Sequence, residues 1–139
     1  MVLRFKDDAA LKRALGAGAS KVAIAKDETV RRRRMNKLEQ AYAQDVLEPL
    51  RLAGEIRDWK FEAIRLRIFE GSQDVKPCAY KPDFLITRPD RSMEFHEVKG
   101  RRHDGGIVRL KACADVYEGF RFALCERDRC GAWRTSWLS

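Results

Sequence analysis

Apolar residues recur at helical spacing over the segment from Met35 to about Ala53. Those that fall on one side of such a helix are Leu38, Tyr42, Val46 and Leu50. Pro49 lies inside the segment, where it removes a backbone donor and clashes with the preceding turn. The pattern therefore predicts a helix with a kink, or a break into two helices, near residues 47–48.

After Gly54 the period changes from helical to extended. Trp59 and Phe61 alternate with charged residues, and the alternation continues at Ile64, Leu66 and Ile68 with a shift of parity. This predicts one strand with a parity shift or two strands in succession. Further strands are expected at 79–87 and 93–99, joined by the turn residues Arg88-Pro89-Asp90-Arg91-Ser92. These two strands form a predicted β-hairpin.

Gly100 ends the hairpin, and residues 101–106 read as a basic, glycine-rich loop. A helix is expected next, with apolar positions at Ile107, Leu110, Ala114 and Tyr117. Final strands are predicted at 120–125 and 133–138, around a turn at Gly131. Trp133 and Trp137 share one parity, which favours packing in the core or at a sheet edge over base stacking.

The chain has 139 residues, of which 45% are hydrophobic, and this suits one folded domain. We expect that domain at residues 31–139. Residues 1–30 read as an arm that is weakly structured or holds a short helix at 7–15, because Gly16-Ala17-Gly18-Ala19-Ser20 would break the helix. Four scattered cysteines without a C-x-x-C pair favour reduced, buried thiols.

The 29 Lys and Arg residues exceed the 21 Asp and Glu residues, for a net charge of +8. This excess indicates a polyanionic partner. Arg31, Arg32, Arg33 and Arg34 form a basic block that suits phosphate, or that is a solvated linker. No apolar stretch is long enough for a membrane span, and the N-terminus lacks the core of a signal peptide. We therefore expect a cytoplasmic protein with no membrane partner.

The predicted hairpin brings chemically useful side chains together. Glu97 and Lys99 share one face of their strand, and the opposing strand can place Asp83 beside them. Two carboxylates about 4 Å apart would repel by roughly 4 kcal/mol at an effective dielectric of 20. A divalent cation removes that cost, and hard oxygen ligands favour Mg²⁺ or Mn²⁺ over zinc. Lys99 could then orient or deprotonate the attacking water, or balance charge in the transition state.

The E-x-K triplet alone is a weak signal, and its context gives it weight. It ends a strand, a basic loop follows, and Glu39 points from the first helix toward the core. Two alternatives need no chemistry: a surface hairpin of salt-bridged residues, and a Glu39 paired with Lys37 or Arg51. His96 alternates away from Glu97 and is expected on the other sheet face or at the surface. Glu62 would join the acidic residues only if its strand faced them.

These residues resemble the PD-(D/E)xK nuclease superfamily, in particular small phage-type endonucleases and Holliday-junction resolvases. The resemblance covers about residues 31–124 and is carried by Glu39, by Lys81-Pro82-Asp83-Phe84 and by Glu97-Val98-Lys99-Gly100. It implies an α/β fold with a restriction-endonuclease-like core, that is, a mixed central sheet flanked by helices. It also implies that Asp83, Glu97 and the carbonyl of Val98 bind metal, that Glu39 assists through water, and that Lys99 is the catalytic lysine.

The expected function is Mg²⁺-dependent hydrolysis of DNA, selective for branched or junction structures, in a bacterial or phage-infected cell. Two alternatives remain open: a DNA-binding module that does not cut, and the nuclease subunit of a restriction, transposition or packaging assembly. Phosphate contacts are expected from the block Arg31–Arg34 and from Arg101, Arg102, His103 and Lys111. A homodimer would suit symmetric cutting of both strands.

Overall fold

The computed structural model of this chain describes residues 33–100 and 104–138. The chain divides into two units, Met1–Arg34 and Met35–Ser139, and all described helices and strands belong to the second. The arm expected at residues 1–30 lies outside the described residues.

The first described element is a helical segment in three parts: α2 at Lys37–Tyr42, the π-helical η2 at Ala43–Leu47, and α3 at Glu48–Leu52. Asn36 caps its start. Pro49 sits in the first turn of α3, where its missing N–H costs least, and the π-helical turn precedes it. The irregularity near residues 47–48 is thus a change of helix type, and the predicted alternative of a break into two helices is wrong because the backbone stays helical there.

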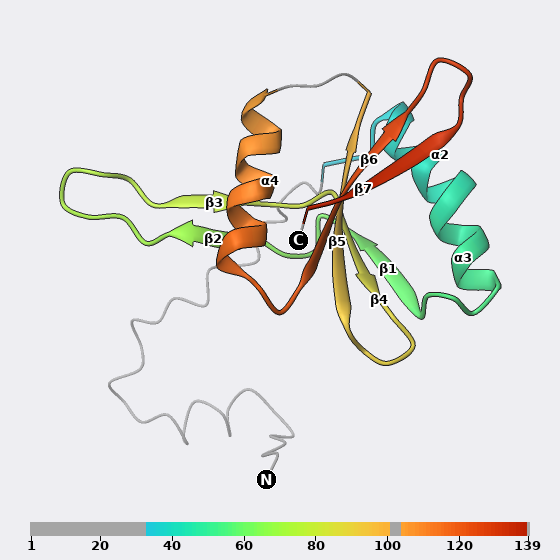
Figure 1. Cartoon of the computed structure of the whole chain (residues 1–139), viewed down its shortest axis with the longest axis horizontal. Coiled ribbons are helices and arrows are strands. Elements are labelled where there is room, and N and C mark those ends of the chain that lie inside the picture. The colour runs from blue at the N-terminus through green and yellow to red at the C-terminus, as the bar shows by residue number, and fades with distance from the viewer. Residues whose placement is uncertain (1–32, 101–103, 139) are drawn as a thin grey trace, which may run out of the picture. The chain divides into compact units, whose positions relative to one another are not determined.

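A five-stranded mixed sheet forms the centre of this unit (Figure 1). Its strands lie in the order β1 (Asp58–Phe61), β4 (Phe84–Thr87), β5 (Met93–Lys99), β6 (Arg121–Arg127) and β7 (Trp133–Trp137). All neighbours are antiparallel except β5 and β6, which are parallel. The predicted hairpin is confirmed as β4 and β5, and the predicted final strands are confirmed as β6 and β7. The fold class is thus mixed α/β, as expected.

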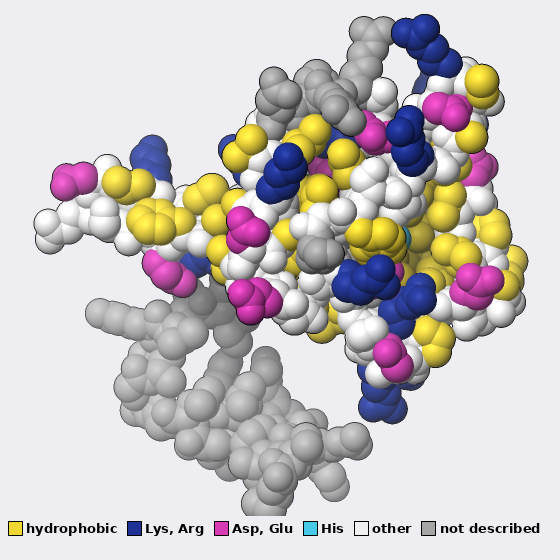
Figure 2. Space-filling model, in the orientation of Figure 1, with side chains coloured by type: hydrophobic (Ala, Val, Ile, Leu, Met, Phe, Trp, Pro, Cys, Tyr) yellow, Lys and Arg dark blue, Asp and Glu magenta, His cyan; other side chains and the backbone are white. Residues whose placement is uncertain are grey.

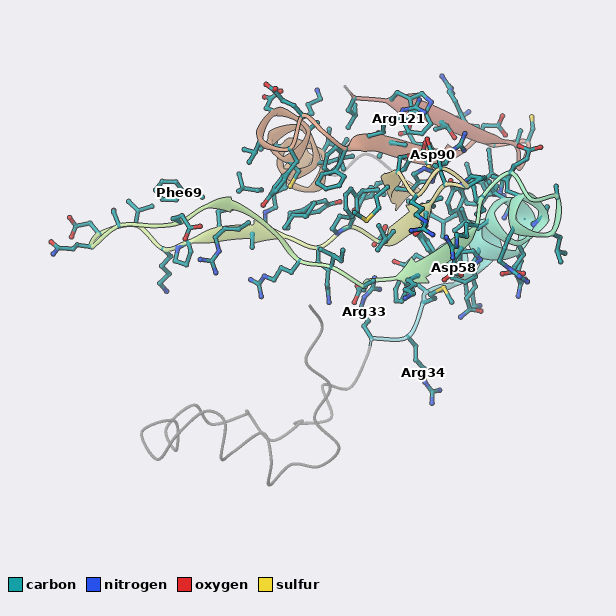
Figure 3. The ribbon with its side chains drawn as sticks, turned by 90° about the horizontal axis from the view of Figure 1, so that it is seen from below. Arg33, Arg34, Asp58, Phe69, Asp90 and Arg121 are labelled. Atoms are coloured by element: carbon teal, nitrogen blue, oxygen red, sulfur yellow. The ribbon has the colours of Figure 1, made fainter. Side chains whose placement is uncertain are left out.

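Two further strands form a separate small sheet. They are β2 (Leu66–Phe69) and β3 (Cys78–Tyr80), paired antiparallel. Figure 3 shows Phe69 on this hairpin, which extends away from the larger sheet. The single strand expected at residues 79–87 is therefore wrong, because β3 and β4 belong to different sheets. Between them lies Lys81-Pro82-Asp83, and Pro82 cannot donate to a strand ladder, so the pairing ends there.

Helix α4 spans Asp104–Val116 and connects β5 to β6. The glycine-rich loop expected at residues 101–106 is thus too long, since Gly105 and Gly106 already belong to α4. The first N–H groups of a helix have no partner within it, and a turn with glycines is tolerated there better than in the interior. The helix therefore begins only a few residues after the end of β5.

Buried residues form one cluster on each face of the large sheet. The first lies under the α2–α3 segment and includes Tyr42, Leu47, Phe84 and Val98. The second lies under α4 and the β2–β3 hairpin and includes Phe95, Leu110 and Phe122. Neighbouring residues of β5 contribute to opposite clusters because side chains alternate along a strand. Strand β5 is thus covered on both faces.

Both tryptophans of β7 make ring contacts within the fold. Trp133 packs against the first cluster with its ring centre 5.0 Å from that of Tyr42, which confirms a packing role. Trp137 lies 5.7 Å from the His96 ring and under the Arg121 guanidinium. All four cysteines are free thiols, of which Cys113 and Cys125 are buried. Cys130 is exposed, contrary to the expectation of burial.

Phe84 offers a test of the first cluster. Its ring is fully buried and lies 5.5–5.7 Å from the rings of Tyr42, Trp59 and Phe61. We expect Phe84→Ala to lower the free energy of unfolding by about 3–5 kcal/mol in urea titrations, because it leaves a cavity among these rings. The control Val108→Ala removes an exposed side chain and should change it by less than about 0.5 kcal/mol. An equally small loss for Phe84→Ala would contradict this packing.

Candidate active site

The register of β4 and β5 brings Asp83 beside Glu97. The antiparallel ladder ends at the pair Phe84 and His96, and Asp83 directly precedes β4, so continuing this register places Asp83 opposite Glu97. The Asp83 carboxylate also accepts a hydrogen bond from the backbone N–H of Val98, with 2.9 Å between Oδ2 and N. Directly opposed residues of a ladder have their side chains on the same face. Asp83 therefore lies next to the Glu97-Val98-Lys99 triplet, as the sequence predicts.

Glu97 is buried, and both of its carboxylate oxygens accept hydrogen bonds. Lys99 Nζ lies 2.5 Å from Oε1, and the hydroxyl of Tyr80 donates to Oε2. Tyr80 was not anticipated from the sequence. It belongs to β3, in the small sheet, and no local pattern relates it to Glu97.

Burial and neighbouring charge act on Asp83 in the same direction. Only 6% of the residue is exposed, and its burial, with the negative charge of Glu97, raises the pKa of its carboxyl to about 7. The hydrogen bond from Val98 and the charge of Lys99 oppose this rise but do not cancel it. Near neutral pH the site therefore holds less negative charge than two free carboxylates would.

Lys99 is half-buried beside these carboxylates. Burial by itself would lower the pKa of its ammonium group, but the hydrogen bond and charge of Glu97, with the charges of Asp83 and Glu39, raise it overall. Lys99 is therefore protonated at neutral pH. Its stem passes the first turn of α4, where a Cβ on Gly106 would lie 3.3 Å from Lys99 Cε. The absence of a side chain at Gly106 leaves room for this lysine.

Glu39 is buried on α2, as expected from its place on the apolar side of the helix. It completes a capping box: its Oε2 accepts from the Asn36 N–H at 2.8 Å, and its own N–H donates to the Asn36 side chain. Its charge also acts on Asp83 and Lys99. Arg51, one of the partners considered for it, pairs with Glu48 at 2.8 Å. Glu39 thus has a structural role and an electrostatic influence on the site.

Several expected DNA contacts lie outside the described residues, namely Arg31, Arg32, Arg101, Arg102 and His103. Arg33, Arg34 and Lys111 are described and exposed. Glu62 forms an ion pair with Lys81 at 2.7 Å, and its backbone N–H donates to the carbonyl of Asp83. It therefore borders the site through its backbone.

His96 lies on the other face of β5, as its parity predicts, and it is buried. Its Nδ1 is 2.8 Å from the hydroxyl of Tyr42, which also accepts from Cys125 Sγ at 3.1 Å. Glu94 lies 3.4 Å from His96 Nε2 and is paired with Arg121 at 3.1 Å. The neighbouring His96 ring lowers the pKa of Glu94, with the charges of Arg88 and Arg121 contributing. These residues form a polar network separate from Asp83 and Glu97.

Within residues 33–100 and 104–138, no group of three or more His, Cys, Asp and Glu side chains is arranged so that it could hold a metal ion. No helix in that same part of the chain has the length and apolar character needed to cross a membrane. Comparison with protein-family models, with curated proteins and with solved structures finds no match for this chain.

The raised pKa of Asp83 predicts a pH-dependent stability. The unfolded chain releases this proton near pH 3.8 and the folded chain near pH 7, so Asp83 destabilises the fold progressively between these values and fully above them. Asp83→Asn stays neutral and can still accept from Val98. In EDTA we expect the variant to gain stability over the wild type as pH rises from 4 to 8, by up to about 4 kcal/mol in urea titrations.

The matched control is Asp115→Asn, which changes an exposed aspartate of α4. Its stability difference from the wild type should stay flat over the same pH range. If the stability difference between Asp83→Asn and the wild type also did not change with pH, the charged form of Asp83 would not destabilise the fold, and the prediction would be contradicted.

Proposed function

We propose that this chain is a Mg²⁺-dependent endonuclease that hydrolyses DNA phosphodiester bonds. One observation carries the proposal: two buried carboxylates lie close together, Asp83 directly before β4 and Glu97 on β5, with the ammonium group of Lys99 on Glu97. Structural ion pairs also perturb pKa values, but a buried pair of acids beside a lysine is typical of catalytic centres. The order Asp, Glu-x-Lys on adjacent strands is the one that PD-(D/E)xK nucleases use.

The order of elements supports the same proposal. The resemblance implies a helix, a sheet with a hairpin, a second helix and a final strand. The structure has its elements in this order. The α2–α3 segment comes first, followed by the antiparallel strands β1, β4 and β5, then by helix α4, and last by β6, which is parallel to β5. The β2–β3 hairpin is inserted between β1 and β4 and is not part of that expectation. A restriction-endonuclease-like core is therefore the proposed fold type.

The residues of the site fit a divalent cation by their chemistry. Hard oxygen donors are available from Asp83 and Glu97. Burial and, after it, repulsion by Glu97 raise the pKa of Asp83, and a cation would relieve the repulsion. Each carboxylate oxygen has two acceptor positions, so Glu97 can keep Tyr80 and Lys99 as donors while it binds metal. The carbonyl of Val98 would be a further ligand, and Glu39 would act through water. Mn²⁺ should substitute for Mg²⁺.

When bound, Mg²⁺ supplies Lewis-acid polarisation of the phosphate and acidifies water. Lys99 is the residue of this chain that adds a positive charge to the site. Because its pKa is raised, Lys99 stays protonated, and this favours a role as hydrogen-bond donor to the attacking water or a phosphate oxygen over a role as general base. Tyr80 and the Val98 N–H hold the two carboxylates in place.

Positive charge supports DNA as the substrate. The chain carries a net charge of +8, and Figure 2 shows Lys and Arg side chains spread over several elements of one face, interspersed with acidic ones. A spread of cations suits contact with the phosphate backbone without reading of bases. Branched or junction DNA is the proposed substrate, in a phage-related or bacterial setting, with a homodimer as the form that would cut both strands.

Cleavage assays test the catalytic assignment. Plasmid, single-stranded and four-way-junction DNA should be cut in Mg²⁺ and left intact in EDTA. We expect Lys99→Ala and Asp83→Asn to lower kcat by at least about 100-fold, because the first removes a positive charge near the transition state and the second removes an anionic ligand of the cation. Lys60→Ala changes an exposed lysine of β1 and should retain the wild-type rate. Wild-type rates for both site variants would end the proposal, and gel shifts without new DNA ends would favour a non-cleaving module.

Salt dependence tests the mode of DNA binding. The logarithm of the association constant should fall linearly with the logarithm of salt concentration, with a slope of about −0.9 for each phosphate contact on duplex DNA. Lys111→Ala removes one exposed cation of α4, so its slope should be shallower by about 0.9. Fluorescence anisotropy with labelled duplex measures both. An affinity independent of salt would contradict backbone binding.

A further inference from the structure

Tyr80 brings the small sheet into contact with the proposed active site. It is 7% exposed and ends β3, and its hydroxyl donates to Oε2 of Glu97, which is 17 positions further along the chain. Its ring packs in the cluster beneath α4. The phenol is thus fixed at the ring by apolar contacts and at the hydroxyl by Glu97.

Both oxygens of the Glu97 carboxylate have a partner from the protein. The Tyr80 hydroxyl donates to Oε2, and Lys99 Nζ lies 2.5 Å from Oε1. These partners come from two strands of different sheets, β3 and β5, so the orientation of the carboxylate depends on both.

The β2–β3 hairpin is attached to its surroundings by other contacts as well. Tyr117 on α4 donates its hydroxyl to the carbonyl of Arg67 on β2 at 2.6 Å, and Lys81 pairs with Glu62 at 2.7 Å. Leu66 pairs with Tyr80 in the ladder and is itself buried. The hydrogen bond from Tyr80 to Glu97 is thus not the only attachment of the hairpin, so it can be removed without detaching the two strands.

We propose that Tyr80 is a positioning residue that fixes the carboxylate of Glu97 in the orientation required to bind a divalent cation. The inference rests on the proposed function and deepens it. A hydrogen-bond donor behind a metal ligand limits the rotation of the ligand, and its loss costs about 10- to 100-fold in metal affinity or activity in known metal sites. The large hairpin insertion thereby gains a functional role, since it supplies this donor.

The test measures cation binding without DNA. Tyr80→Phe removes only the hydroxyl, so we expect the Kd for Mn²⁺, measured by calorimetry, to rise by at least about 10-fold. In cleavage assays the Mn²⁺ concentration for half-maximal rate should rise by the same factor, while kcat at saturating Mn²⁺ stays within about 3-fold of the wild type. A weaker affinity for Mn²⁺ with a nearly unchanged kcat is the result expected of a residue that positions a metal ligand. A residue that takes part in the chemical step would lower kcat.

Tyr117→Phe is the matched control, because it removes a tyrosine hydroxyl that holds the same hairpin but does not touch Glu97. Its Kd for Mn²⁺ should equal that of the wild type. An equal loss of affinity in both variants would mean that Tyr80 only anchors the hairpin. Wild-type affinity in a folded Tyr80→Phe variant would overturn the inference while leaving the proposed function intact.

A wild-type protein that neither binds Mn²⁺ nor cuts DNA would overturn both proposals. If Tyr80→Phe does not fold, NMR of the wild type with labelled tyrosine gives the answer. The Tyr80 hydroxyl proton should appear downfield as a hydrogen-bonded resonance and shift on addition of diamagnetic Mg²⁺, whereas the Tyr117 signal should not. No change at Tyr80 in saturating Mg²⁺ would overturn the inference.

Discussion

Two buried carboxylates on adjacent strands impose the main electrostatic constraint on this fold. Burial raises the pKa of Asp83 to about 7, and repulsion by the neighbouring Glu97 adds to the rise. The chain compensates with donors from the backbone of Val98, from Lys99 and from Tyr80. Buried charge is retained only where such donors satisfy it, so these contacts define the site.

The connection between the two sheets allows this compensation. Lys81-Pro82-Asp83 leads from β3 in the small sheet to β4 in the large one, so Tyr80 before it and Asp83 at its end can both lie near Glu97. Asp83 arrives through the register of β4 with β5, and Tyr80 arrives through the hairpin.

Strand β5 separates two polar systems. Glu97 and Lys99 lie on the side of α4, whereas Glu94 and His96 lie on the side of Tyr42 and bond to residues of α2, β6 and the Arg88 turn. Burial of this strand on both faces is what places four ionisable side chains in low dielectric surroundings. Only the face of α4 combines two opposed carboxylates with a lysine, and it is the face proposed for catalysis.

Sequence by itself determined the local features: the first helix and its interruption at Pro49, the β4–β5 hairpin with its turn, and the shared face of Glu97 and Lys99. Periodicity and turn chemistry act over a few residues, so they can be read along the chain. Tertiary structure decided the split of residues 79–87 between two sheets, the early start of α4 and the contact of Tyr80 with Glu97. These three features depend on which strands pair and on how α4 packs against the sheet. Both are set by contacts between residues far apart in the sequence.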